Sequence, residues 1–166
     1  MSVTQNFPSE CVWAFLSYQR KPDQNSAIMI KFIFLFNKIG KPRIVRFYDN
    51  PLESQRITVQ KEVSNVCLAH SKQEGILDYK DYTLVYRHYG NLVFAAGITE
   101  DENELAVLEL LHNLVETLMK YLNKVIILNM DKVHMILDEM IIEGYISETN
   151  QSRILAPLQL LDTVRK

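Results

Sequence analysis

The chain has 166 residues, of which 48% are hydrophobic and 23% are charged, a composition typical of one ordinary globular domain. Its formal net charge of −2 excludes the dominant positive field of a nucleic-acid-binding protein, so no nucleic-acid partner is expected. Two cysteines are too few for a disulfide framework, and no apolar run reaches the roughly 18 to 20 residues that would cross a bilayer. These features predict a cytoplasmic domain.

The first 28 residues differ in composition from the rest of the chain. The stretch MSVTQNFPSECVWAFLSYQRKPDQNSAI contains many proline, asparagine, serine and glutamine residues, which weaken regular structure. Its apolar piece, residues 11–16, is too short for the core of a signal peptide. We therefore expect a loosely ordered N-terminal extension over residues 1–28 and a single domain over residues 29–166.

A β-hairpin is predicted at the start of this domain. The stretch IMIKFIFLFN is apolar on both faces, as in a central strand, because Ile33 and Leu35 lie opposite a second apolar row. That second row consists of Ile28, Ile30, Phe32, Phe34 and Phe36. A turn at KIGK then leads into PRIVRFY, which is rich in β-branched and aromatic residues.

A helix should follow, because Asn50 is a capping residue, Pro51 suits the first helical position and Glu53 suits the first turn. We expect it to continue to about Ser71. Its buried face would carry Val59, Val63, Val66 and His70.

Residues 75–98 read as three short antiparallel strands with a tight turn at Gly90. The sequence YTLVYRHYG within them invites a catalytic interpretation, since Arg87 and His88 are adjacent. Alternation along a strand, however, places these two side chains on opposite faces of the sheet. They cannot converge on one substrate atom, so the catalytic interpretation is rejected.

A long helix begins after Gly97, with Asp101 and Glu104 as a capping pair. Apolar residues then recur at intervals of three and four, which predicts a mostly buried helix. They are Leu105, Leu108, Leu110, Leu111, Leu114, Val115, Leu118, Tyr121, Leu122 and Val125.

Two further helices are expected. One spans about residues 130–143 and ends at Gly144, a residue suited to a left-handed terminator. The last restarts after residue 148, with Pro157 either kinking it or opening it. Hairpin-linked strands followed by segregated helices predict an α+β fold, with a five-stranded antiparallel sheet flanked by helices.

The residue types that carry chemistry do not gather into a recognisable motif. The five glycines are isolated, which excludes a phosphate-binding loop. His134, Asp138 and Glu139 lack a further ligand at matched spacing, so a His–Asp pair on a solvated helix face is favoured over a metal site. His112 and Glu116 would form a polar edge of the long helix, and Cys67 would be a small core residue. We predict no enzyme activity, no cofactor and no metal.

From Met29 onward the sequence closely resembles the sigma (small) subunits of heterotetrameric clathrin-adaptor-type complexes. The matching segments are, in chain order, MIKFIFLFNKIGKPRIVRFY, YKDYTLVYRHYGNLVF, ENELAVLELLHNLVETL, DKVHMILDEMIIEGYISETN and SRILAPLQLLD. DKVHMILDEM and ETNQSRILAPL are most similar to sigma of the fourth adaptor-protein complex. The sigma subunit of the third adaptor-protein complex is the next most similar. The resemblance implies a longin-like domain.

The resemblance also implies a role in vesicle-mediated protein transport. Such a subunit would contact a large adaptin chain directly and share a heterotetramer with a medium chain and a second large chain. The complex would bind cargo tails and be recruited by an Arf GTPase to trans-Golgi network, endosome or coated-vesicle membranes. Alternatives are a free-standing longin-type regulator of SNAREs or small GTPases, and a coatomer zeta-like subunit.

In some of these complexes sigma carries part of a pocket for acidic dileucine sorting signals. By position, the resemblance implies Arg43 as the basic residue, and Gly90, Leu92, Val115 and Val125 as the wall. The chain departs from the family after Val125, where VIILNMDKVH is shorter than the segment that contributes to the pocket elsewhere. The extension ahead of Met29 is the second departure.

Overall fold

A computed structural model of the chain describes residues 30–70, 72–99, 103–123 and 126–164. The extension predicted over residues 1–28 lies outside this part. The sheet has five strands, in the order β2-β1-β5-β4-β3, and every neighbouring pair is antiparallel. The strands are β1 (Ile30–Asn37), β2 (Pro42–Phe47), β3 (Glu74–Tyr79), β4 (Tyr82–Tyr89) and β5 (Leu92–Ile98).

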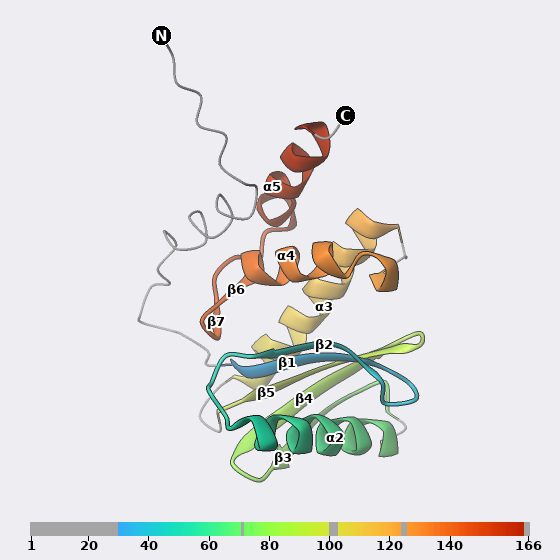
Figure 1. The fold of residues 1–166 in the computed structure, drawn as a ribbon, viewed down its shortest axis with the longest axis vertical. Coiled ribbons are helices and arrows are strands. Elements are labelled where there is room, and N and C mark those ends of the chain that lie inside the picture. Colours follow the sequence, from blue (N-terminus) through green and yellow to red (C-terminus); the bar gives the residue numbers. More distant parts are fainter. Residues whose placement is uncertain (1–29, 71, 100–102, 124–125, 165–166) are drawn as a thin grey trace.

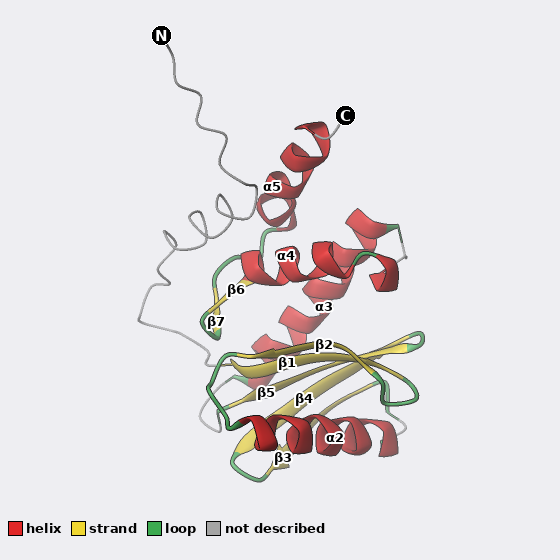
Figure 2. Cartoon of the chain, viewed as in Figure 1, coloured by secondary structure: helices red, strands yellow, loops and turns green. Residues whose placement is uncertain are grey.

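The helices lie in two unequal layers, one on each face of the sheet (Figures 1 and 2). One face is covered by α2 (Glu53–Ala69). The other carries α3 (Glu104–Leu122) and α4 (Met130–Met140), with α5 (Gln151–Val164) packed on these two. A short 3-10 helix, Ile126–Leu128, precedes α4. This arrangement confirms the α+β prediction.

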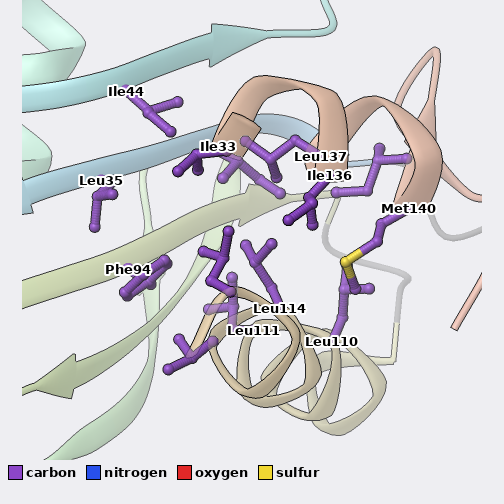
Figure 3. Packing of buried hydrophobic residues seen from close by; sticks show 14 of the residues in the cluster. Ile33, Leu35, Ile44, Phe94, Leu110, Leu111, Leu114, Ile136, Leu137 and Met140 are labelled. Atoms are coloured by element: carbon purple, nitrogen blue, oxygen red, sulfur yellow. The ribbon is translucent and has the colours of Figure 1, made fainter. Parts of the chain in front are cut away.

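The larger core lies between the sheet and α3, α4 and α5 (Figure 3). Ile33 and Leu35 of β1 point toward Leu111 and Leu114 of α3, and Leu137 of α4 closes the layer. All five side chains are almost completely buried. Each such burial contributes about 1.5–3 kcal/mol, so this layer is the main source of stability.

The smaller core lies between the sheet and α2, and it is aromatic. Phe32 stacks on Phe34 with ring centroids 4.4 Å apart, and Tyr82 meets Phe32 edge-on at 5.1 Å. Val63 and Cys67 are the completely buried apolar residues that α2 contributes. Phe34 and its neighbours therefore face α2 while Ile33 and Leu35 face α3, as the alternation along β1 predicted.

Ile30 does not follow the predicted alternation. It belongs to the core beneath α3, although the sequence placed it in the same row as Phe32. The pairing of β1 with β5 shifts register between Ile30 and Phe32, and this irregularity rotates Ile30 to the other face.

Both predicted helix starts were displaced toward the C-terminus. The N-cap of α2 is Leu52 rather than Asn50, and the Gln55 side chain accepts a hydrogen bond from the Leu52 amide at 3.2 Å. The N-cap of α3 is Asn103, whose Oδ1 accepts from the Ala106 amide at 3.1 Å. Because asparagine caps as well as aspartate does, the capping pattern alone could not choose Asn103.

The predicted end of the third helix was wrong. The helix stops at Met140, and β6 (Ile141–Ile142) and β7 (Tyr145–Ile146) form a small antiparallel hairpin. Gly144 does adopt a left-handed conformation, φ +84°, but in the hairpin turn rather than as a helix cap. A Cβ atom there would lie 2.6 Å from the carbonyl oxygen of Ile30, so the tight backbone approach requires glycine.

Burial along α3 follows a narrower stripe than predicted. Leu105 is 67% exposed, whereas Val107, which the sequence did not single out, is completely buried. Of the two alternatives at Pro157, the structure excludes the opening of a helix there, because the C-terminal helix continues through this residue.

We expect Leu111→Ala to lower the free energy of unfolding by about 2–5 kcal/mol, because it leaves a cavity in the larger core. Leu105→Ala on the same helix should change it by less than about 0.5 kcal/mol. Urea unfolding at low protein concentration measures both. Equal losses from the two variants would contradict this assignment of the core.

Candidate functional site

Three of the five predicted pocket residues lie at one end of the sheet: Arg43 on β2, Gly90 in the β4–β5 turn and Leu92 at the start of β5. The two hairpin turns meet there, because the amide of Lys38 donates to the carbonyl of Asn91 at 3.2 Å. We call this region the hairpin end and define it as residues 37–43 and 90–92.

The β1–β2 turn in the hairpin end is fixed by its own polar contacts. The side-chain oxygen of Asn37 accepts from the amides of Ile39 at 3.1 Å and Lys41 at 2.8 Å. Gly90 has φ +55° in the neighbouring turn. These contacts hold the turn in one conformation, and Ile39 projects from it with its side chain 89% exposed.

Arg43 and Leu92 provide two different chemistries at the hairpin end. The Nε of Arg43 is buried and has no hydrogen-bond partner within the described part of the chain. Leu92 is 8% exposed and belongs to the larger core. The hairpin end therefore presents a cation, while its aliphatic side chain Leu92 is covered by the larger core in this conformation.

The other two predicted residues are not part of this surface. Val115 is completely buried in the larger core, so its side chain does not line an open slot in this conformation. Val125 lies outside the described residues. A signal pocket formed by all five residues therefore stays a prediction.

The His134–Asp138 pair of α4 is connected to the sheet through Arg46. One guanidinium nitrogen donates to Asp138 Oδ1 at 2.8 Å and lies 3.3 Å from His134 Nδ1. Burial and then the nearby Arg46 charge lower the pKa of His134, while burial raises the pKa of Asp138. Within the described residues no group of three side chains could hold a metal ion. The pair is thus an ion-paired link between β2 and α4 rather than a solvated helix face.

A second polar chain links β4 to α3. The Tyr89 hydroxyl and His112 Nδ1 are 2.5 Å apart, and His112 Nε2 lies 3.3 Å from Glu116. The tyrosine and imidazole rings also stack, with an interplanar angle of 15°. His112 and Glu116 thus form the predicted polar edge, and the sequence did not indicate that Tyr89 completes it.

Arg87 and His88, which invited a catalytic interpretation, make contacts within the sheet instead. Arg87 pairs with Glu74 on the adjacent strand at 3.2 Å, and His88 packs edge-on against Tyr86. Cys67 is completely buried, and burial raises the pKa of its thiol to about 12, so the thiol stays protonated and unreactive.

A cleft of about 600 Å³ lies beside the N-terminal half of α2. Two ion pairs bound it: Lys31 with Asp81 at 3.3 Å, and Lys80 with Glu62 at 2.5 Å. The hydroxyl of Tyr82 is buried there without a hydrogen-bond partner in the described part of the chain. Sequence reasoning missed this cleft, because its residues come from four separate segments.

The helices in the described ranges include none that is long and apolar enough to span a bilayer. Residues 29–165 match the family model of the clathrin adaptor complex small chain. The chain belongs to that family. This match confirms the resemblance to adaptor small subunits that the sequence motifs indicated. The protein is a small subunit of an adaptor complex in vesicle trafficking.

Among relatives, the mouse AP-4 complex subunit sigma-1 is 44% identical over 139 residues, which cover 81% of this chain and 96% of the relative. The Arabidopsis thaliana AP-4 complex subunit sigma is 38% identical over 138 residues, covering 80% and 96%. The human AP-3 complex subunit sigma-2 is 38% identical over 152 residues, covering 83% and 77%.

The fold is also similar to that of a chain in a homology model of the full-length AP-3 complex in a stretched open conformation. The TM-score is 0.66 at 24% identity, over 82% of this chain and 95% of that one. This likeness confirms the fold class. The family consists of adaptor subunits, which agrees with the non-enzymatic prediction.

Proposed function

We propose that this small adaptor chain is the sigma subunit of a complex of the fourth adaptor type. The observation that carries the proposal is the similarity to AP-4 sigma subunits from an animal and a plant, each matched over 96% of its own length. The AP-3 sigma-2 relative is matched over 77% of its length, so the fourth type fits better than the third.

In this role the chain contacts a large adaptin directly and completes a heterotetramer with a medium chain and a second large chain. The assembled complex binds the sorting signals of cargo tails. An Arf GTPase recruits it to trans-Golgi network, endosome or coated-vesicle membranes. What supports association is the presence of large exposed aliphatic side chains, such as Ile39, Leu128 and Leu160.

We expect the tagged chain to co-purify in equal amounts with the large, medium and second large chains of a fourth-type complex when all four are co-expressed. Expressed alone it should aggregate, because the side chains that contact the large chain are then exposed. Quantitative mass spectrometry and light scattering measure the two outcomes.

The matched control replaces the fourth-type partner chains with those of a third-type complex, which should be retained less well. A monodisperse monomer that retains none of the partner chains would contradict the subunit role. Stronger retention of the third-type chains would contradict the assignment to the fourth type.

We also propose that the hairpin end contributes to the recognition of acidic dileucine signals. Arg43 would pair with the acid of the signal, and the leucines would enter an apolar slot lined by Leu92, Val115 and Val125 in a conformation that opens it. What supports this role is the position of Arg43, a half-buried cation at the start of β2 beside the two hairpin turns.

We expect Arg43→Ala to weaken the binding of an acidic dileucine peptide to the assembled complex only moderately, because an exposed ion pair contributes about 0.2–1 kcal/mol. Val125→Asp should weaken it much more, because each buried leucine contributes about 1.5–3 kcal/mol. Fluorescence anisotropy measures both, with Lys120→Ala as an exposed cation on α3 for control.

Both variants must still co-purify with the large chain, which separates a binding defect from misfolding. If the wild-type complex shows no measurable affinity for the peptide, the shortened segment after Val125 has removed the site. The small subunit then has a structural role alone.

A further inference from the structure

The outer edge of β3 can accept a further strand. β3 is the last strand of the described sheet and pairs with β4 on one side. The helix α3 packs over β4 and β5, inward of this edge. An edge strand carries a row of backbone N–H and C=O groups that can pair with another chain. The hairpin end adjoins β2 at the opposite edge, so the two surfaces are separate.

The register of β3 shows which of its residues offer these groups. The amide of His88 donates to the carbonyl of Gln73, directly opposite, at 2.7 Å, so these two residues are a hydrogen-bonded pair. In antiparallel strands such pairs alternate with pairs that are not hydrogen-bonded. The backbone N–H and C=O groups of Glu74, Ile76 and Asp78 therefore point outward.

The side chains of the same three residues share one face of the sheet. Ile76 lies opposite Val85 of β4, which belongs to the core beneath α3. Glu74 and Asp78 are two residues away on either side, so they project toward the same face. Both acids are exposed, and Ile76 between them is 38% exposed. The edge thus presents an acid, an aliphatic side chain and an acid in one row.

The charge on this face is mostly negative. Burial raises the pKa of Tyr89 and the Arg87 charge lowers it, while three carboxylates raise it further. These belong to Glu116, Glu74 and Glu109, so β3 and α3 contribute to one negative region. Arg87 pairs with Glu74 at 3.2 Å, yet the Glu74 side chain is 46% exposed. Because a carboxylate accepts several hydrogen bonds, Glu74 can bind a second cation.

A second copy of this chain does not suit the edge. In an antiparallel pairing centred on Ile76, Glu74 of each copy would face Asp78 of the other. Like charges directly opposite each other are destabilising. A strand with cations at those two positions has the complementary charge, so the edge selects a basic segment.

We propose that the outer edge of β3 binds an extended basic segment of a protein partner. The segment adds antiparallel as a sixth strand, with cations opposite Glu74 and Asp78 and an aliphatic side chain opposite Ile76. Directly opposite side chains project on the same face, so the segment reads cation, any residue, aliphatic, any residue, cation. Backbone pairing supplies affinity and the side-chain row supplies selectivity. This interaction goes beyond the assembly and signal recognition proposed above and does not depend on either.

The test uses the full chain, ¹⁵N-labelled and carried on a soluble fusion partner, titrated with an end-capped peptide that contains Lys-Thr-Val-Thr-Lys. Amide NMR signals of Glu74, Ile76 and Asp78 should shift together, and added salt should weaken the binding. A peptide with glutamate in place of each lysine should bind at least about tenfold more weakly, a difference of about 1.4 kcal/mol.

A reordered peptide separates the side-chain row from a general attraction between charges. The order Thr-Lys-Val-Lys-Thr has the same composition, but with valine opposite Ile76 its lysines project from the other face of the sheet. It should bind at least about threefold more weakly, because both ion pairs are lost.

N-methylated peptides test the backbone pairing. A valine opposite Ile76 exchanges both backbone hydrogen bonds with it, so methylating the valine nitrogen should raise the Kd at least about tenfold. The neighbouring threonines direct their N–H groups away from β3, so methylating one of them should raise the Kd by no more than about twofold.

Variants of the chain complete the test. Glu74→Gln combined with Asp78→Asn removes both charges with little change of shape, and it should raise the Kd for the lysine peptide about threefold or more. Glu53→Gln combined with Asp131→Asn neutralises two exposed carboxylates on α2 and α4 and should leave the Kd unchanged. An unchanged amide spectrum away from the substituted positions shows that each variant is folded.

Five results would overturn the proposal: no binding of the lysine peptide by the wild-type chain, shifts confined to other elements, equal binding of the reordered peptide, equal effects of methylating valine and threonine, or equal losses in the two double variants.

Discussion

The fold depends on a sheet whose central strands cannot face water on either side. β5 is buried at every position from Leu92 to Ile98. In β1, Ile30 and all five residues from Phe32 to Phe36 are buried as well. A sheet of this kind must be covered on both faces, which requires helices above and below it. The longer helices α3 and α4 cover one face and α2 covers the other, and the functional surfaces lie where this covering ends.

Much of this layered arrangement was predictable from the pattern of apolar residues. Ile33 and Leu35 opposite Phe32 and Phe34 indicated a strand buried on both faces, and the apolar stripe of residues 105–125 indicated a buried helix. What the pattern could not give were features set by tertiary pairing. The register shift near Ile30 and the hairpin after Met140 depend on neighbouring strands that a local periodicity does not describe.

The candidate site was predictable in part, through the resemblance of the sequence to a family. The resemblance grouped Arg43, Gly90 and Leu92, and the two hairpin turns that contain or adjoin these residues do meet in the structure. It also selected Val115, which the structure buries, because position in a motif does not report exposure. Arg46 contacts His134 and Asp138, which lie 88 and 92 positions further along the chain. No local signal in the sequence indicates such a contact.

The two faces of the sheet differ in how tightly their helices are held. The helices over the larger core are joined to the sheet and to each other by polar links, such as Arg46 to Asp138 at 2.8 Å and Lys132 to Asp162 at 2.7 Å. In contrast, α2 buries only Val63, Ser64 and Cys67, and it lies between a cleft of about 600 Å³ and a groove of about 220 Å³. Amide hydrogen exchange of the full chain tests this directly. The amides of β1, β5 and the centre of α3 should exchange slowest, at the free energy of global unfolding, while those of α2 exchange through a lower-energy local opening. Protection of α2 equal to that of β1 would contradict the account.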